Sequence, residues 1–386
     1  MLEAREKGEC DMIDMTTLQD FLAQTPSGPF VSIYLPREPH QDVAAVHLEL
    51  RHLIAHAKDV MATTFPEQAW APYADQLAQL FDTPQRITGN TAHGLGVLVD
   101  SERLQAFALD TPVTSSAMVT TYPQVLPLLA DAQKQRDFDV LVLQRDRIAL
   151  YHHEDATLVP VALPEAAPQT LVGTLGDELR GGNLNSVSQG PGSVSYHGHT
   201  EKSAEEANDT KRFFQAVDEY VAEHYSKPHQ RALVLWGLPQ TLSVYRELSR
   251  NPFLATVQLE VSPANLKATD LARAANTLVS DFDAQARHAL LTELDDARSG
   301  GRIVETLAEV VAAINTHAVM HLLLQVGARV DGQLVDGVLD QKSPQAQHNN
   351  LLNDLAELAV VQGGRVSLLP ETQLAAPVVA ILRYAQ

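Results

Sequence analysis

An apolar run in the middle of the sequence restricts the folds that the chain can adopt. Residues 231–236 are apolar after the initial arginine. A strand without a polar face has to be covered on both sides, as in sheets that are flanked by helices. An amphipathic pattern from Ala204 to Tyr225 supplies one such helix. The middle of the chain is therefore predicted to form an α/β layer.

The length of 386 residues predicts two or three domains rather than one core. A content of 45% hydrophobic and 20% charged residues is ordinary for globular proteins and excludes a disordered, collagen-like or coiled-coil chain. The expected fold class is α/β and α+β in three domains. We expect a polar leader (1–14), an α+β N-terminal domain (15–133), a middle domain (136–262) with a long loop (164–203), a helical connector (264–298) and a small α/β/α sandwich as C-terminal domain (299–386).

The periodicity of apolar residues places the elements within these domains. In the first domain the pattern predicts strands at 30–35, 94–100 and 104–109 and helices at 43–62 and 68–81. In the middle domain it predicts a β meander (138–144, 148–152, 157–163), a helix (204–225), a strand (231–236), a helix (240–250) and a strand (254–261). The remainder is predicted as helices at 264–297, 303–316 and 349–361 and strands at 320–326, 365–369 and 377–384, with Gly363 at a helix C-terminus.

The charge balance limits the partners of the chain. Lys and Arg number 28 and Asp and Glu number 48, which gives a formal net charge of −20. A broad nucleic-acid-coating surface is thereby excluded, because the overall field repels phosphate. The single cysteine, Cys10, excludes a disulfide framework and a thiolate zinc site. Neither a signal peptide nor an apolar run of membrane-spanning length is found, so a cytoplasmic protein without membrane contact is expected.

One segment differs from the rest of the chain in charge. Residues 179–200 contain no acid, a single arginine at 180 and many glycines. Long loops inside compact domains are usually functional or disordered, so this segment is interpreted as a binding loop.

Signatures of catalysis and metal binding are weak. The sequence has no G-x-S-x-G elbow and no P-loop. His197 and His199 lack a third ligand at a recognisable interval, and adjacent His152 and His153 would point to opposite faces of a strand. Asp139 opens the first strand of the middle domain, where ribonuclease-H-type nucleases place a metal-binding aspartate. No cofactor, no metal and no catalytic residue is expected.

Several stretches together resemble a known family. Residues 303–310, 317–324, 355–366 and 378–384 look like the third domain of archaeo-eukaryotic peptide-chain release factors and of Pelota-type rescue factors. The whole chain from about residue 16 is similar to the bacterial branch of that group. Its further matching stretches are Tyr122-Pro-Gln-Val-Leu-Pro-Leu-Leu129, Asp139-Val-Leu-Val-Leu143 and Lys211-Arg-Phe-Phe214.

This resemblance implies a ribonuclease-H-like middle domain and a translation factor that occupies the tRNA site of stalled or idle ribosomes. The implied partners are rRNA at the peptidyl-transferase centre and a translational GTPase, with no DNA. Release factors need a Gly-Gly-Gln tripeptide, which this chain lacks, so peptide release is not expected. The residues expected to contact the ribosome are Arg180, Gln189, Tyr196, His197, Gly198, His199, Lys202, Lys211 and Arg212.

Two other functions remain open from the sequence. The same loop would serve a peptidyl-tRNA hydrolase with His197 or His199 as general base, or an RNA-cleaving enzyme with Asp139 as a metal ligand. A stress-linked adaptor would instead bind other proteins through acidic faces and would not contact ribosomes.

Overall fold

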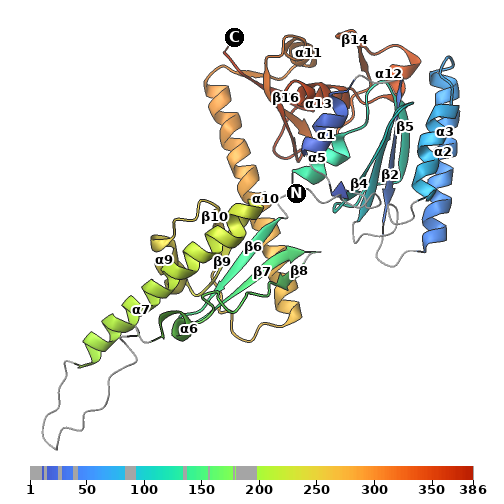
Figure 1. Cartoon of the computed structure of the whole chain (residues 1–386). Helices are drawn as coiled ribbons and strands as arrows, with labels where there is room; N and C mark the ends of the chain where they lie inside the picture. Colours follow the sequence, from blue (N-terminus) through green and yellow to red (C-terminus); the bar gives the residue numbers. More distant parts are fainter. Residues whose placement is uncertain are drawn as a thin grey trace, which may run out of the picture. The chain divides into compact units, whose positions relative to one another are not determined.

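The computed structural model divides the chain into two compact units. Unit 1 comprises residues 1–134 and 286–386, and unit 2 comprises residues 135–285 (Figure 1). The structure describes residues 11–12, 15–24, 28–37, 42–82, 93–133, 137–154, 157–176, 179 and 198–385. The predicted mixture of α/β and α+β architecture is confirmed, whereas the domain boundaries stay a prediction.

The first sheet of unit 1 has five strands in the order β1-β4-β3-β2-β5. All of its neighbouring pairs are antiparallel except β1 with β4. Its strands are β1 (Asp11–Met12), β2 (Phe30–Pro36), β3 (Gly94–Val99), β4 (Leu104–Leu109) and β5 (Ser116–Thr120). Two residues of the segment predicted as a polar leader therefore belong to the sheet, since β1 pairs with β4.

Helices cover both faces of this sheet. On one face, α2 (Val43–Thr64) and α3 (Ala71–Asp82) bury residues such as Leu50 and Leu77 against alternate residues of β2 and β3. On the other face, Tyr34 and Phe107 pack in a core with α1 (Met15–Leu22) and α5 (Leu126–Ala132). The alternation of inward and outward residues along each strand makes this double cover possible.

The C-terminal part of unit 1 contributes a four-stranded sheet in the order β11-β16-β12-β15. Only β12 and β15 are parallel. Its strands are β11 (Ile303–Val304), β12 (Val319–Gln325), β15 (Arg365–Leu369) and β16 (Val378–Leu382). The remaining elements are α11 (Leu307–Asn315), the hairpin β13 (Gln333–Val335) and β14 (Val338–Asp340), α12 (Pro344–His348) and α13 (Leu351–Val361).

Helix α13 is the most enclosed helix among those described. Nine of its eleven residues are buried, including Asn353, Asp354 and Glu357. A helix that is buried all round occurs between layers rather than at a surface. Its apolar residues share one core with both sheets of unit 1, together with α1, α5 and α11. The first and last thirds of the sequence therefore fold together.

A buried hydrogen-bond network joins α13 to the N-terminal part of the chain. The Asn353 side-chain oxygen accepts from the backbone N–H of Val125 at 2.6 Å and of Leu126 at 3.2 Å, and its amide donates to the carbonyl of Pro123. These residues lie about 230 positions apart in sequence. Every polar group of the Asn353 side chain is thus satisfied, as burial requires.

Unit 2 is built on one mixed sheet in the order β10-β9-β6-β7-β8. Strands β6, β9 and β10 are parallel, and β7 is antiparallel to both β6 and β8. The strands are β6 (Phe138–Leu143), β7 (Ile148–Glu154), β8 (Thr157–Pro160), β9 (Ala232–Gly237) and β10 (Leu254–Leu259). With the strands numbered 1 to 5 in chain order within this unit, the order across the sheet from β8 to β10 is 3-2-1-4-5. The predicted ribonuclease-H-like sheet with its meander is thereby confirmed.

Helices lie on both faces of this sheet as well. One face is covered by α7 (Gly198–Val221) and α9 (Pro239–Leu248), and the short α6 (Leu171–Leu175) packs beside α7. A π-helical turn (Ala222–Ser226) and α8 (Lys227–His229) extend α7. The other face is covered by the first half of α10 (Ala268–Ser299). The second half of α10 packs on the C-terminal sheet of unit 1, so the boundary between the units falls inside this helix.

Two sequence predictions need correction. The helix predicted at 303–316 begins only at Leu307, because residues 303–304 pair with β16 and Thr306 caps the helix in a capping box with Glu309. Helical residues at 171–175 and from Gly198 onward fall inside the predicted loop 164–203, because Thr170 caps α6 and residues 199–203 contain no helix breaker. Among the described residues, no helix combines the length and the hydropathy of a membrane span.

The Asn353 network predicts a large loss of stability in Asn353→Ala. The substitution leaves two N–H groups and one carbonyl buried without partners, which should lower the free energy of unfolding of unit 1 by about 3 kcal/mol. Urea unfolding followed by Trp70 fluorescence in a Trp236→Phe background reports on this unit, because Trp70 and Trp236 are the two tryptophans of the chain. Asn315→Ala, which removes one bond at an exposed residue, is the control. Equal effects of the two substitutions would contradict this role of Asn353.

The acidic pair on α13 predicts a dependence of stability on pH. Burial raises the pKa of Glu357 to about 8, with repulsion from Asp354 adding to it, and burial raises the pKa of Asp354 to about 7. Both carboxyls therefore bind protons more tightly in the folded chain than in the unfolded chain, where their pKa is about 4. Unit 1 should lose stability as the pH rises through this window, from about 4 to 8.

Glu357→Gln should remove part of this pH dependence. The substitution should stabilise unit 1 more at pH 8.5 than at pH 6, and the difference should be about 2 kcal/mol. Melting of the Trp236→Phe protein and of its Glu357→Gln derivative at both pH values measures it, with the exposed Glu371→Gln as control. A gain that is the same at both pH values would show that the Glu357 carboxyl is not held protonated.

Candidate functional site

The segment that the sequence singles out for binding lies largely outside the described residues. This applies to Arg180, Gln189, Tyr196 and His197. The structure does describe both of its borders, which are α6 on one side and the first turns of α7 on the other. Gly198, His199 and Lys202 belong to those first turns. The expected ribosome-contacting residues therefore enter α7 at its N-terminal end.

Helix α7 carries the remaining two predicted contact residues. Lys211 is exposed, and Arg212 lies with its Nη1 3.8 Å from a carboxylate oxygen of the buried Asp209, one turn earlier. Arg145, in the turn between β6 and β7, forms an ion pair of 2.8 Å with Glu206 on the same helix. The Arg145–Glu206 pair is exposed on both sides and contributes little to stability. Lys211 and Arg212 thus lie about four turns from Gly198, and the structure does not place them next to the start of the helix.

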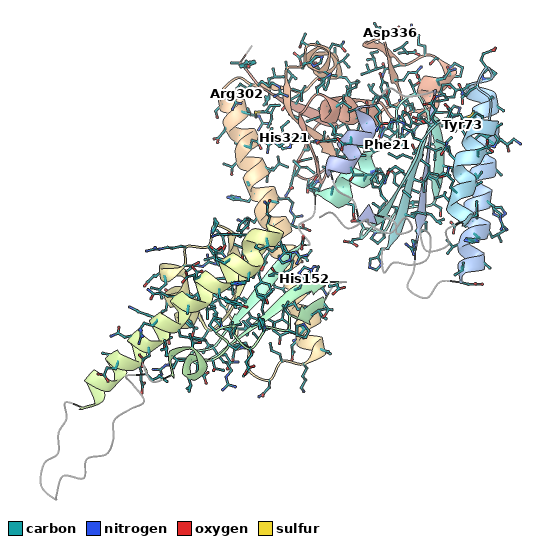
Figure 2. The ribbon with its side chains drawn as sticks, viewed as in Figure 1. Phe21, Tyr73, His152, Arg302, His321 and Asp336 are labelled. Carbon is teal, nitrogen blue, oxygen red and sulfur yellow. The ribbon has the colours of Figure 1, made fainter. Side chains whose placement is uncertain are left out.

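The aspartate that opens β6 lies in a cluster of opposite charges. Asp139 is buried, and its Oδ1 lies 3.0 Å from His152 Nδ1 on the neighbouring strand β7 and 4.0 Å from Arg231 Nη1 ahead of β9. The Arg231 Nε atom in turn lies 2.5 Å from Asp137. Strand register explains the meeting, because Asp139 pairs with His152 across the sheet and Phe138 pairs with Ala232. Figure 2 shows His152 on this sheet.

The groups around Asp139 are better suited to stabilise its negative charge than to bind a metal ion. Burial raises the pKa of Asp139 above its ordinary value, while the hydrogen bond from His152 and the charge of Arg231 oppose the rise. The Arg231 guanidinium lies beside the Asp139 carboxylate. A metal-dependent nuclease would need further acidic side chains there instead. Among the residues that the structure describes, no group of three or more His, Cys, Asp or Glu could hold a metal ion.

The adjacent histidines separate as their positions in a strand require. His153 is buried and stacks on Phe138, with ring centroids 4.6 Å apart, on the side of the sheet opposite to His152. The prediction that His152 and His153 point to opposite faces of the strand is thereby confirmed. The sequence did not predict that Arg231 belongs to this cluster. A usable signal was present, because this cation directly precedes an apolar strand that lies in register with the acids of β6.

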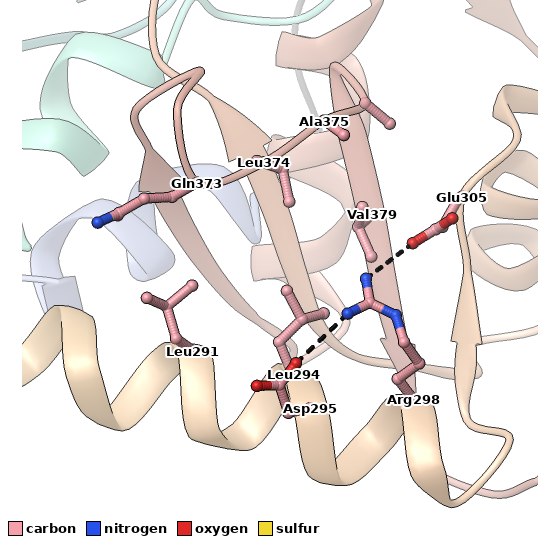
Figure 3. Close-up of a pocket in the computed structure, with 10 residues that line it drawn as sticks. Leu291, Leu294, Asp295, Arg298, Glu305, Gln373, Leu374, Ala375 and Val379 are labelled. Carbon is pink, nitrogen blue, oxygen red and sulfur yellow. Dashed lines mark hydrogen bonds and ion pairs between the residues drawn. The ribbon is translucent and has the colours of Figure 1, made fainter.

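Unit 1 contains a pocket of about 310 Å³ between the second half of α10 and the segment that precedes β16. Leu291, Leu294 and Leu374 line its apolar part (Figure 3). Its cation, Arg298, is bound by Asp295 at 3.3 Å and by Glu305 at 3.2 Å. Because two carboxylates neutralise this guanidinium, the pocket offers no attraction for an anionic ligand.

The comparison with protein families supports the resemblance seen in the sequence. Residues 136–281 match the family model of bacterial archaeo-eukaryotic release factor family 6. This range coincides with unit 2 to within a few residues. The family resemblance is thereby confirmed over this segment.

Solved structures give weaker likenesses. The chain is similar to the archaeal translation termination factor aRF1, with 15% identity, 98% of this chain and 100% of that chain covered and a TM-score of 0.25. Archaeoglobus fulgidus Pelota gives 12% identity, 75% and 79% coverage and a TM-score of 0.33. S. cerevisiae Dom34, described as a translation termination-like factor that interacts with Hbs1, gives 12% identity, 76% and 79% coverage and 0.40. No curated protein sequence matches the chain. These likenesses add nothing to the family match.

The Asp139 cluster predicts coupled effects on stability. Arg231→Met should lower the free energy of unfolding of unit 2 by about 2 kcal/mol, because the buried carboxylate loses a counter-charge. Adding Asp139→Asn should recover part of this loss, since no buried charge then remains unpaired. Unfolding followed by Trp236 fluorescence in a Trp70→Phe background measures both variants. Strictly additive losses would show that Arg231 does not stabilise the Asp139 carboxylate.

Proposed function

We propose that the chain is a ribosome-associated translation factor of the release factor and Pelota type, which occupies the tRNA site of stalled or idle ribosomes without hydrolysing peptidyl-tRNA. The observation that carries the proposal is the release-factor-family domain at residues 136–281. Inside this domain the acid-free segment 179–200 leads into α7. Such a segment is the part of the chain with the least electrostatic cost of approaching RNA.

The absence of one tripeptide supports occupancy rather than hydrolysis. The 386 residues contain Gly-Gly at 181–182, 300–301 and 363–364, and none of these pairs is followed by glutamine. The resemblance implies that the tripeptide helps to position the hydrolytic water, so a chain without it lacks that device. Rescue and hibernation both need occupancy of the site and not cleavage.

The net charge of −20 predicts a narrow contact with RNA. The cations in and after the segment are Arg180, Lys202, Lys211 and Arg212, which limits the number of neutralised phosphates to a few. The salt dependence of ribosome binding should therefore be shallow, because its slope is about −0.7 to −0.9 per neutralised phosphate. The C-terminal part of unit 1 is proposed to contact the ribosome or a translational GTPase.

Cosedimentation with ribosomes tests the proposal. The full chain should pellet with purified ribosomes in low salt. Replacing residues 180–197 with a short Gly-Ser linker together with Lys202→Ser should reduce the pelleted fraction about tenfold, because Arg180 and Lys202 are lost with the contact segment. Arg147→Glu, at an exposed residue of the same unit, is the control and should bind like the unchanged chain. Failure of the full chain to pellet, or binding that is unaffected by the replacement, would contradict the proposal.

A release assay distinguishes occupancy from hydrolysis. With ribosomes that carry a labelled peptidyl-tRNA, saturating amounts of the chain should release no peptide above background. Peptide release that disappears in His197→Ala would instead support a hydrolase that uses this histidine as general base.

A further inference from the structure

A second hydrogen-bonded cluster lies in unit 1, outside residues 136–281, which match the release-factor family model. Glu293 lies on α10, His321 on β12, and Arg365 and Ser367 on β15. The parallel register pairs His321 with Arg365 and Leu323 with Ser367, which brings the side chains to the sheet face that α10 covers. Figure 2 shows His321 on this sheet near α10.

The hydrogen bonds connect the Glu293 carboxylate through His321 to the Ser367 hydroxyl. Glu293 Oε2 lies 3.2 Å from His321 Nδ1, and His321 Nε2 lies 2.9 Å from Ser367 Oγ. Because a carboxylate only accepts hydrogen bonds, Nδ1 carries the proton, and Nε2 accepts from the serine hydroxyl. The imidazole is buried while Ser367 is half-buried on the edge strand β15. Ser367 is thus the partly exposed residue of this hydrogen-bonded group.

The His321 imidazole is in the protonation state that a general base needs. Burial and the charge of Arg365 lower the pKa of His321 below its ordinary value, and Glu293 opposes this shift. The ring is therefore neutral near pH 7 and able to accept a proton from Ser367. A nucleophile, a base within hydrogen-bond distance and a third group that orients the base are the parts that nucleophilic catalysis requires.

We propose that Ser367, His321 and Glu293 form a serine-esterase-type site that accepts carboxylic esters with an anionic group. The Ser367 Oγ attacks the ester carbonyl carbon and its proton passes to His321 Nε2. The bond to the alcohol breaks, and the alcohol leaves with that proton. Water, deprotonated by His321, then hydrolyses the acyl-serine to the free acid and restores the hydroxyl. Glu293 is the positioning residue of the base.

Arg365 determines the charge of the substrate. It lies two residues before Ser367 on the same strand and face, and its side chain is 62% exposed. The contact with Glu293 occupies one of its five N–H donors. The guanidinium therefore places a positive charge beside the nucleophile, where it favours an anionic acyl group and the oxyanion that forms in the reaction.

Covalent labelling tests the nucleophile. The full chain is incubated with a fluorophosphonate probe, which forms an Oγ–P bond to an activated serine and loses fluoride. Mass spectrometry of peptides should locate the probe on Ser367, and Ser367→Ala should abolish the label. No label on Ser367 of the unchanged chain, under conditions that label a known serine esterase completely, would overturn the proposal.

Variants of the base and of its positioning residue separate catalysis from structure. His321→Gln should slow labelling of Ser367 by about 100-fold, and Glu293→Gln should slow it less while the final extent stays complete. His152→Gln in unit 2 is the matched control, because that histidine also bonds a carboxylate but is not needed at Ser367. A melting curve confirms that each variant is folded. Unchanged labelling rates in folded His321→Gln would overturn the proposal.

The substrate assignment is tested with two esters. Hydrolysis of mono-(4-nitrophenyl) succinate should exceed that of 4-nitrophenyl acetate by about tenfold, and Arg365→Gln should remove this preference. Hydrolysis of neither ester would overturn the esterase activity. Equal rates with both esters in the unchanged chain would overturn the assignment of anionic substrates.

Discussion

The burial of α13 is the constraint on which unit 1 depends. A helix enclosed on all sides has no solvent for its polar side chains, so Asn353, Asp354 and Glu357 need partners inside the protein. Asn353 obtains them from residues 123–126, and Asp354 accepts from Asn349 and from the backbone of Leu334. These bonds can form only when the two ends of the chain fold together. The network therefore specifies the pairing of the N-terminal and C-terminal parts as much as it stabilises them.

This pairing explains the unusual order of the units along the chain. Unit 2 is encoded by a continuous segment that interrupts unit 1 in sequence. Such an insertion is tolerated when the interrupted unit has its own contacts across the gap, which the core shared by α1, α5, α11 and α13 provides. Helix α10 takes part in both cores, with Leu278 in unit 2 and Leu294 in unit 1. Its length of 32 residues without proline or glycine is what allows this.

The sequence predicted those elements whose apolar pattern is unambiguous. Strands β4 and β15 have the predicted bounds, and the left-handed Gly363 ends α13 as expected, with φ of +73°. Strand β5 was missed because it has only five residues, and its polar residues Ser116 and Thr120 lie at the two ends without alternating. The hairpin β13–β14 was missed although Asp336 and Gly337, both with positive φ, form the Asp-Gly turn that favours a tight hairpin. The strand β11 was taken as helix, although Thr306 and Glu309 signal a helix that starts later.

The two histidine–carboxylate pairs show why a site is harder to predict than a strand. Asp139–His152 and Glu293–His321 have nearly the same contact, at 3.0 and 3.2 Å. The sequence drew attention to the first pair because its acid opens a strand, whereas nothing in the spacing of Glu293, His321 and Ser367 connects them. Only the parallel register of β12 and β15, set by apolar residues far from the chemistry, brings a hydroxyl to the second nitrogen of His321. The chemical difference between the pairs is therefore a consequence of strand pairing and not of any local motif.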